Sequence, residues 1–434
     1  GCAACISRAL APPNKTVISL FTFHIMEFGP KYPGSAFIGR FYQFCEISKT
    51  NSFYKILERI ICLYKEMKKV LNYISYQSFP ANTANSLQTI SNLKYLAKNY
   101  YEIRLFFPLR ENNSSDDLKI LQKYYFFNEN ISVKGLNHPY PFGKFNYFNK
   151  LFFHLSHFLW GKSTSKMFTQ EKFENEYFFT RSDWILYFLA KKNLNIIFEC
   201  HQYSKVRNFV FNRVASRKNV QIIFLNEFIK KEFTNQNLSY LILPSAVDLE
   251  LFENVNSIEK EQNKISFVGN LLRFGKERNL DIVIDALSSS ELKNYKLSII
   301  GGPNSEVRKI KEKLEKLNVT NVKLTGRLER IKVAKELKTS SVGLLINSSD
   351  KHSKFFTSPL KYFEYVAAKL KIVAIDYPSH KILPFQENIY YFKNKSSLIS
   401  AIKDACKSEF HNVELDKISL DTRAKKIIKL LENF

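Results

Sequence analysis

The residues of this sequence best suited to chemistry are one carboxylate and one basic loop, both in its second half. Glu364 lies in the apolar stretch SPLKYFEYVAAKLKIVAID, residues 358–376, which predicts a helix leading into a strand. A carboxylate can accept two hydroxyl hydrogen bonds at once, which suits the vicinal diol of a ribose. The alternative is an ordinary helix surface on which Glu364 pairs with Lys361.

The basic loop follows an apolar strand in FVGNLLRFGKERNLDIVIDAL and precedes an amphipathic helix. It contains Gly269, Arg273, Gly275, Lys276 and Arg278. Backbone N–H groups and cations in such a loop can bind an anion. The loop lacks the Gly-Lys-Ser/Thr ending of a P-loop, and a loop of this composition is also common as plain solvated surface.

Apolar runs separated by helix-compatible segments predict the sheet that positions these residues. In the second half the runs lie at 264–270, 296–302, 321–327, 341–347 and 370–376. Continuous rather than alternating apolar runs are typical of buried parallel strands, so we expect a doubly wound domain. The helix that carries Glu364 is expected to begin near Pro359, with Ser358 as its N-cap and free N–H groups in its first turn.

The first half has the same organisation. Strands are expected at 68–76, 101–108, 195–204, 220–227 and 239–245, with an amphipathic helix following the first of them. We therefore predict an α/β protein of two Rossmann-like doubly wound parallel-sheet domains facing a central cleft. The expected boundaries are 67–243 for the N-terminal domain, 244–415 for the C-terminal domain and 416–434 for a C-terminal helix.

Residues 1–66 do not follow this alternation. Met67, followed by two lysines and a strand, resembles a bacterial start. We therefore expect residues 1–66 to be an appended or upstream-translated segment, and a genuine extension is the alternative.

Length and composition narrow the function classes. A chain of 434 residues with 45% hydrophobic and 24% charged residues can bury two large cores. The formal net charge of +25 comes largely from lysines spread along the chain, which argues against a nucleic-acid binder and leaves a compositional bias or contact with an anionic membrane surface. The six cysteines lack disulfide or zinc spacing, and no signal peptide or run of about 18 apolar residues occurs, which indicates a reduced, cytoplasmic protein.

Several motifs, in order, resemble family 4 glycosyltransferases of the GT-B fold over about residues 67–434. The donor half of that family is similar to FVGNLLRFGKERNLDIVIDAL, LSIIGGP, VKLTGRL, SSVGLLI and SPLKYFEYVAAKLKIVAID, and its acceptor half to NIIFECH and the crossover YLILPSAVDLELF. The resemblance implies transfer of a sugar from a UDP- or GDP-sugar to a hydroxyl of a cell-surface glycan or lipid-linked precursor. It also implies retention of configuration and no metal or other cofactor.

The resemblance assigns roles to individual residues as well. It implies that Glu364 holds the ribose, that Arg278 or Lys276 neutralises the diphosphate, and that Gly269 lets the backbone approach it. The other positions that it implies are Arg273 in the basic loop, Arg327 and Leu328 near the base, Ser358, Pro359, Leu360 and Lys361 at the helix start, and Asn85 and Ser86 across the cleft.

His201 ends a buried strand in FECHQYS, at the carboxyl edge where ligands of such sheets bind. A single histidine there is more often structural, but the resemblance places it close to the donor sugar as an orienting or proton-sharing group. Glu199 shares its face if the pleat continues, either as a cleft-lining acid or as a buried structural acid.

The sequence also departs from the family pattern. Phe356 stands where the first Glu of the family's paired-Glu element is usual, and Asp350 could replace that acid only after a loop rearrangement. Lys369 stands where glycine is usual, and Ser245 where asparagine is usual. These changes concern the identity of the donor more than the binding of a nucleotide.

Two other functions stay open, a sugar-nucleotide epimerase and a non-catalytic protein that binds a nucleotide sugar or a membrane. The aromatic and basic segment 140–162 is expected to be a core helix, and the alternative is an interfacial helix that reaches a lipid-linked acceptor. The expected location is the cytoplasm, with peripheral attachment to the inner face of the cytoplasmic membrane as an open alternative.

Overall fold

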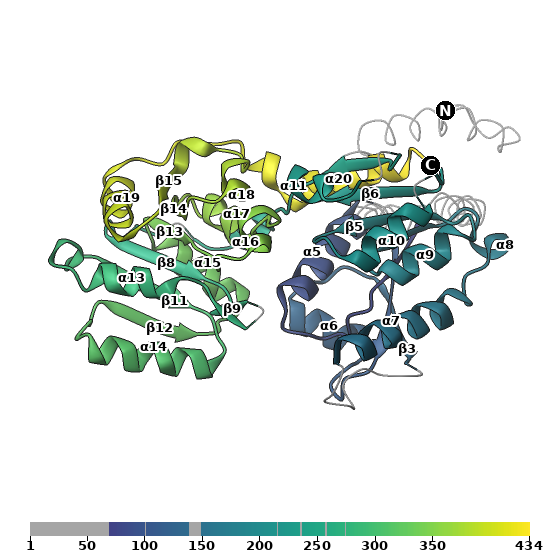
Figure 1. Ribbon diagram of the computed structural model, residues 1–434, viewed down its shortest axis with the longest axis horizontal. Helices are drawn as coiled ribbons and strands as arrows, with labels where there is room; N and C mark the ends of the chain where they lie inside the picture. The colour runs from purple at the N-terminus through teal and green to yellow at the C-terminus, as the bar shows by residue number, and fades with distance from the viewer. Residues whose placement is uncertain are drawn as a thin grey trace, which may run out of the picture.

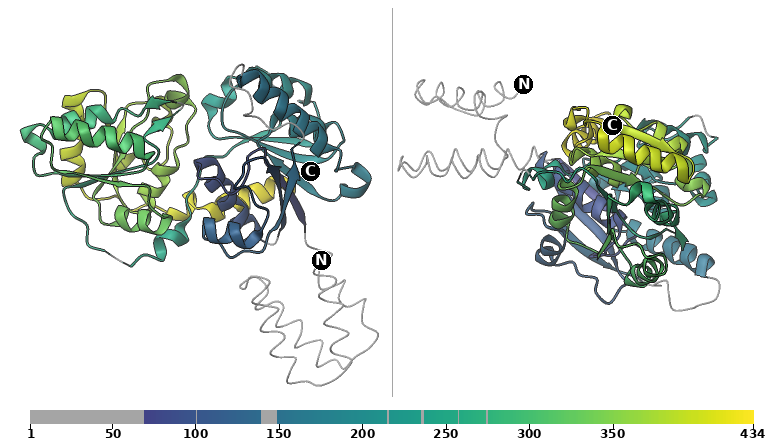
Figure 2. Two further views of the ribbon diagram at one scale, coloured as in Figure 1. Left: turned by 90° about the horizontal axis from the view of Figure 1, so that it is seen from below. Right: turned by 90° about the vertical axis from the view of Figure 1, so that its left-hand side faces the viewer.

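A computed structural model describes residues 69–434 except residues 100, 139–148, 215, 235–236, 257 and 274. The predicted appended segment 1–66 therefore lies outside the described residues. Two lobes stand side by side, one built around each of two parallel sheets (Figure 1, Figure 2).

The first sheet has seven strands in the order β3-β2-β1-β4-β5-β6-β7, all parallel. Its strands are β1 (Val70–Ile74), β2 (Glu102–Leu109), β3 (Ser132–Asn137), β4 (Tyr177–Thr180), β5 (Asn195–Cys200), β6 (Val220–Phe224) and β7 (Tyr240–Ile242). The order reverses between β1 and β4, and such switch points are where open α/β sheets bind ligands.

The second sheet has six parallel strands in the order β12-β11-β8-β13-β14-β15. They are β8 (Lys264–Val268), β11 (Lys296–Ile300), β12 (Val322–Gly326), β13 (Val342–Leu345), β14 (Lys371–Ile375) and β15 (Ile389–Phe392), and a small hairpin joins β9 (Leu272–Arg273) to β10 (Lys276–Glu277). This is the strand order of a dinucleotide-binding Rossmann domain, with its switch point between β8 and β13.

Helices cover both faces of each sheet. They are α5 (Ala84–Lys98), α6 (Leu118–Tyr125), α7 (Asn149–Ser165), α8 (Gln170–Phe173), α9 (Asp183–Ala190), α10 (Lys205–Val214), α11 (Glu227–Lys231), α12 (Leu249–Glu253), α13 (Leu280–Leu287), α14 (Asn304–Lys316), α15 (Arg330–Lys338), α16 (Lys351–Phe355), α17 (Leu360–Ala367), α18 (Pro378–Lys381), α19 (Lys395–Lys407) and α20 (Leu420–Leu431), with short 3₁₀ turns at Ser290–Leu292, Gln386–Asn388 and Leu415–Ile418. In the first lobe, α7, α9 and α10 pack on one face, and α5, α6 and α20 on the other.

The predicted two-sheet α/β fold is confirmed, and all ten strands expected from apolar runs are present. Three further strands of the two sheets, β3, β4 and β15, were not predicted. β3 is an edge strand whose residues SVKGLN are mostly exposed, so it carries no apolar run. β4 and β15 have only four residues each, too few for a clear pattern.

The C-terminal helix α20 returns to the first lobe instead of completing the second (Figure 1). Leu420, Ala424 and Ile427 join the buried cluster that α5 forms with the first sheet. The chain thus crosses between the lobes twice, and the two crossings pair at Val247 and Ser419. We call this paired stretch, residues 243–248 with 418–420, the hinge.

Lys369 follows helix α17 with φ of 55°, a left-handed conformation that favours glycine. The side chain of Lys260 donates to the carbonyls of Ala368 and Lys369 at 2.9 Å each, so the free carbonyls of this helix end are satisfied by a lysine. Lys369 therefore adopts the left-handed backbone conformation at the position where the family usually has glycine.

Candidate functional site

Glycines form the carboxyl edge of the second sheet. Gly269 follows β8, Gly301 follows β11 and Gly326 ends β12. A Cβ added at Gly301 would lie 1.8 Å from the carbonyl oxygen of Gly269, so only glycine fits there, whereas a Cβ at Gly269 would meet nothing within 4 Å. The backbone at Gly269 is thus open to a ligand, in keeping with its predicted role.

Two cations converge on the end of β13. Arg278 donates through Nη1 to Oδ1 of Asn347 at 3.4 Å, and the buried Lys361 donates through Nζ to the carbonyl of Ile346 at 2.7 Å. The Lys361 ammonium also lies 4.4 Å from the centre of the Phe267 ring. Arg273 and Lys276 pair through their backbones in the β9–β10 hairpin that precedes Arg278.

The start of α17 differs from the prediction by one residue. The helix begins at Leu360, Pro359 is its N-cap, and Ser358 lies before the cap. The Ser358 hydroxyl instead accepts a hydrogen bond from the backbone N–H of Ser245 at 2.9 Å, because it faces the hinge. The expected cap by Ser358 is therefore wrong.

Glu364 lies one turn further along α17 and is half-buried. Burial raises the pKa of its carboxyl, and the Arg330 guanidinium on α15 opposes that rise. Arg330 in turn donates through Nη1 to the Ser91 hydroxyl of α5 at 3.1 Å, which places this corner at the junction of the two lobes. Because Lys361 points to Ile346, the surface ion pair that was the alternative for Glu364 does not form.

Arg327 and Leu328 follow the last strand of this edge. The exposed Arg327 donates to Oδ1 of Asn270 at 3.4 Å and lies over Gly302, where an added Cβ would be 3.1 Å from its Nε. Leu328 is half-buried in the loop that leads to α15. Both residues therefore lie beside the glycine edge, where the base of a nucleotide was expected.

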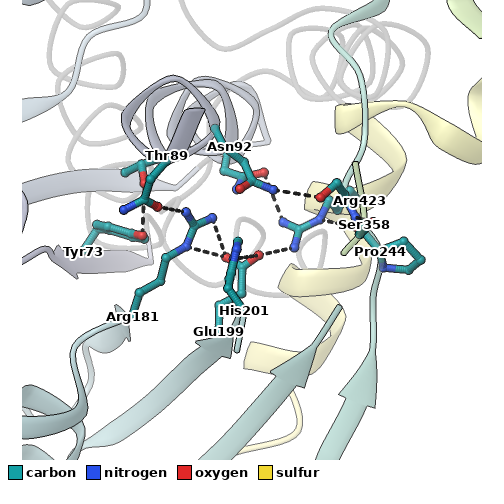
Figure 3. Close-up of polar contacts among 12 residues, drawn as sticks. Tyr73, Thr89, Asn92, Arg181, Glu199, His201, Pro244, Ser358 and Arg423 are labelled. Carbon is teal, nitrogen blue, oxygen red and sulfur yellow. Dashed lines mark hydrogen bonds and ion pairs between the residues drawn. The ribbon is translucent and has the colours of Figure 1, made fainter. Parts of the chain in front are cut away.

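The carboxyl edge of the first sheet carries a buried ion-pair cluster (Figure 3). The side chain of Glu199 has no exposed surface, and its oxygens lie 2.9 Å from Nη2 of Arg181 and 2.6 Å from Nη2 of Arg423. Nε2 of His201 lies 3.1 Å from Glu199 Oε1. Of the two interpretations of Glu199, its packing is that of a buried structural acid rather than a cleft-lining one.

Electrostatics fix the protonation states in this cluster. Burial acts to raise the pKa of Glu199, but Arg181 and then Arg423 hold it well below its usual value, so the acid is ionised. Burial and Arg181 lower the pKa of His201 to about 4. His201 is therefore a neutral imidazole at pH 7, able to accept or share a proton.

The other two first-domain candidates lie at the start of α5. Asn85 is exposed and bridges the cluster to the loop after β1, donating to Gln77 at 2.7 Å and accepting from Arg181. Ser86 is buried, and its hydroxyl belongs to the capping box with Thr83. Asn85 is thus exposed at the edge with its amide contacting Gln77 and Arg181, whereas Ser86 is occupied in capping the helix.

Phe356 is buried in the core cluster of the first lobe, although it belongs to the second. Asn226, which caps α11, donates to the backbone carbonyls of Phe355 at 3.1 Å and Thr357 at 3.3 Å. Asp350 caps α16, accepting from Ser353 N at 3.0 Å. The position of the missing acid is therefore a contact between the lobes, and Asp350 is held away from it.

Arg181, Arg330 and Arg423 were not singled out from the sequence. Arg181 comes directly after β4, which was not predicted, so its place at the sheet edge gave no signal. Arg423 lies 224 residues from Glu199 in an ordinary amphipathic helix. Only the return of α20 to the first lobe brings it to the cluster.

Comparison with known proteins identifies the second domain. Residues 249–409 match the family model described as "Glycosyl transferases group 1". The second domain is thus similar to the group 1 glycosyltransferases. The Gly269 edge, Arg278 and α17 with Glu364 all lie within the matched residues. Among the curated proteins compared by sequence, none matches the chain.

The whole described chain has the GT-B fold of solved glycosyltransferases. It is similar to Anabaena Alr3699/HepE, solved in complex with UDP and glucose (TM-score 0.58, 12% identity, covering 84% of this chain and 100% of that one). It is also similar to a trehalose-phosphate synthase from Burkholderia xenovorans, in complex with glucose-6-phosphate (0.59, 12%, 83% and 99%). A third similar structure is the lipopolysaccharide outer core galactosyltransferase WaaB in its apo form (0.55, 14%, 84% and 98%).

Proposed function

We propose that this protein transfers a sugar from a UDP- or GDP-sugar to a hydroxyl of a cell-surface glycan or its lipid-linked precursor, with retention and without a metal ion. The observation that carries the proposal is the donor corner of the second domain. There the open backbone at Gly269 follows β8, the cations Arg278 and Lys361 contact the residues after β13, and Glu364 lies one turn into α17. That set matches the ribose, the diphosphate and the close backbone approach that a nucleotide sugar requires.

The donor side would work mainly by electrostatic stabilisation. When the glycosidic bond to the diphosphate breaks, negative charge develops on the leaving phosphate oxygens. Arg278, Lys361 and the first-turn N–H groups of α17 are fixed before the reaction, so they stabilise that charge without reorganising. Cations of the chain would thereby take the place that a metal ion has in other transferases.

The acceptor side would be organised by His201. As a neutral imidazole beside the ionised Glu199, it can accept a hydrogen bond from a sugar hydroxyl and orient it. The exposed Asn85 contacts Arg181, which in turn contacts Glu199, and its amide offers a further polar contact to the acceptor. Retention would follow if the leaving diphosphate assists deprotonation of the acceptor on the same face.

A thermal-shift screen with UDP-, GDP-, ADP- and CMP-sugars tests the donor class, because a ligand that binds only the folded state raises the melting temperature. We expect a rise with UDP- or GDP-sugars that persists in EDTA. Product analysis of the positive donor then separates three outcomes. Transfer to an acceptor supports the proposal, a free altered sugar indicates an epimerase, and binding without turnover indicates a non-catalytic protein.

We also propose that the protein contacts an anionic membrane surface, where a lipid-linked acceptor would be located. Helix α7 buries Trp160 but leaves Leu151 66% and Leu155 44% exposed, and α10, which packs on the same helix α9, exposes 45% of Phe209. Of the segment 140–162, residues 149–162 belong to α7, which buries Trp160 on one side and exposes Leu151 and Leu155 on another, whereas residues 140–148 lie outside the described residues. Apolar side chains next to lysines are the composition of an interfacial surface, and the net charge of +25 favours anionic lipids. Across the part of the chain that the structure describes, no helix is long and apolar enough to cross a bilayer.

Vesicle sedimentation tests this partner. We expect the protein to sediment with vesicles containing anionic lipid and less with neutral ones, and the double change Leu151→Glu with Leu155→Glu to reduce sedimentation severalfold. Leu317→Glu, at a leucine 41% exposed in the second domain, is the matched control. Equal sedimentation of the double variant and the wild type would show that α7 does not contact the membrane.

A further inference from the structure

Arg423 on α20 lies at the centre of a chain of polar contacts between the two halves of the proposed site. Its side chain is 2% exposed, and three of its nitrogens contact three different segments. Nη2 contacts Glu199 Oε1 at 2.6 Å, Nη1 donates to Asn92 Oδ1 of α5 at 3.1 Å, and Nε donates to the carbonyl of Pro244 in the hinge at 2.9 Å. A planar guanidinium suits this arrangement, because its donors have a fixed geometry that a lysine ammonium lacks.

The path continues in both directions from Arg423 (Figure 3). Towards the acceptor side it passes through Glu199 to His201, whose Nε2 is 3.1 Å from the shared carboxylate oxygen. Towards the donor side it passes along the backbone from Pro244 to Ser245, whose N–H donates to the Ser358 hydroxyl at 2.9 Å. Ser358 lies two residues before the first residue of α17, the helix that carries Glu364.

We propose that Arg423 is a positioning residue for the transfer reaction. Through Glu199 it fixes the orientation of His201, and through the Pro244 carbonyl it ties that orientation to the hinge that joins the two lobes. The expected effect of Arg423 on turnover rests on the proposed function. The contacts of Arg423, and its expected effect on the pKa of His201, do not. Arg423 reaches the site only through other residues, so it is not itself a catalytic group.

The charges around His201 provide a direct readout. The groups that face it among the described residues are Glu199, Arg181 and Arg423. Burial and Arg181 lower the pKa of His201 to about 4, Glu199 opposes the lowering, and Arg423 adds to it. Removing Arg423 takes away one cation and leaves Glu199 with one partner fewer, so the pKa of His201 should rise towards its ordinary 6.5.

The experiment compares Arg423→Met and Arg423→Lys with the wild type by NMR of histidine-labelled full-length protein, with His201→Asn used to assign the His201 signals. We expect the His201 pKa to rise in Arg423→Met and to return towards the wild-type value in Arg423→Lys, which restores the charge. Arg104→Met, which removes an arginine paired with Glu176 in the same domain, should leave His201 unchanged. Far-UV circular dichroism and melting curves establish that each variant is folded.

Calorimetry with UDP and turnover of UDP-glucose provide the second readout. We expect Arg423→Met to bind UDP within about twofold of the wild type, since Glu364 and Arg278 are untouched, while kcat falls by about 10- to 100-fold because His201 is misplaced. A folded Arg423→Met protein in which His201 titrates as in the wild type would overturn the proposal. So would a loss of UDP affinity as large as the loss of kcat, which would indicate general damage. If the wild type binds no nucleotide, the proposed function fails, and the NMR titration still decides whether Arg423 positions His201.

Discussion

Replacing Glu364 by alanine is expected to weaken binding of UDP or GDP by about 10- to 100-fold. Hydroxyl hydrogen bonds to a carboxylate are charge-assisted, and losing a single one costs on the order of 1.5–3 kcal/mol, at about 1.4 kcal/mol for each tenfold change in affinity, so one of the two bonds already accounts for this range. Glu364 is half-buried at the junction of the lobes, where burial raises its pKa and the Arg330 guanidinium opposes that rise. Isothermal calorimetry at pH 7 measures the effect directly.

Two further variants sharpen this test. Glu364→Gln keeps the shape and one acceptor oxygen, so it should bind more tightly than Glu364→Ala but less tightly than the wild type. Glu315→Ala changes a glutamate that is 65% exposed on α14 and should leave nucleotide affinity unchanged. If Glu364→Ala binds UDP and GDP as the wild type does, the carboxylate has no part in the nucleotide site.

The second large effect is expected on stability, from replacing Glu199 by glutamine. The wild-type carboxylate lies between Arg181 and Arg423 with none of its side chain exposed. Glutamine has nearly the same shape but no charge, so it leaves two buried cations without an anion. Breaking a buried pair in this way costs about 3–5 kcal/mol of unfolding free energy, which urea denaturation would register as a lower midpoint.

The pH dependence distinguishes this charge effect from a packing defect. The folded-state pKa of Glu199 lies well below the ordinary 4.5, so its ion pairs stabilise the protein fully above pH 4.5 and are lost as the pH falls through the folded pKa. The stability difference between wild type and Glu199→Gln should therefore be constant near neutral pH and shrink in acid. Glu102→Gln, at an exposed pair with Arg104, should cost no more than about 1 kcal/mol. A difference that stays the same down to acid pH would mean that packing, rather than charge, is responsible.

Much of the fold could be predicted because buried parallel strands have a simple signature. Runs such as NIIFEC and KIVAI are mostly apolar, with three or four apolar residues in succession, and the structure places both in the interior of a sheet. The places of Gly269, Arg278 and Glu364 in the fold were predictable for a related reason: Gly269 follows a recognisable strand, Arg278 lies in the loop before a recognisable helix, and Glu364 lies within one. Strand β3 and strand β4 could not be found in this way, since one is an exposed edge and the other has four residues.

The contacts at the carboxyl edge of the first sheet could not be predicted from the sequence. His201 could be singled out because it directly follows a strand, but its charge state depends on Arg181 and Arg423, which come from other parts of the chain. Phe356 is a similar case. Its sequence position marks it only as a missing acid, whereas its burial in the core of the other lobe explains why an apolar ring is kept there. Contacts between segments hundreds of residues apart leave no periodic pattern to detect.

The return of α20 also has a consequence for how the protein is made. The helical layer over the first sheet includes Leu420, Ala424, Ile427 and Leu431, so that layer is incomplete until α20 has left the ribosome. The nascent first lobe must wait with an apolar face uncovered while the entire second lobe is synthesised. The first lobe therefore cannot complete its core before the second lobe has been synthesised. A fragment ending at the first crossing, near residue 248, would lack the part of that core that α20 supplies.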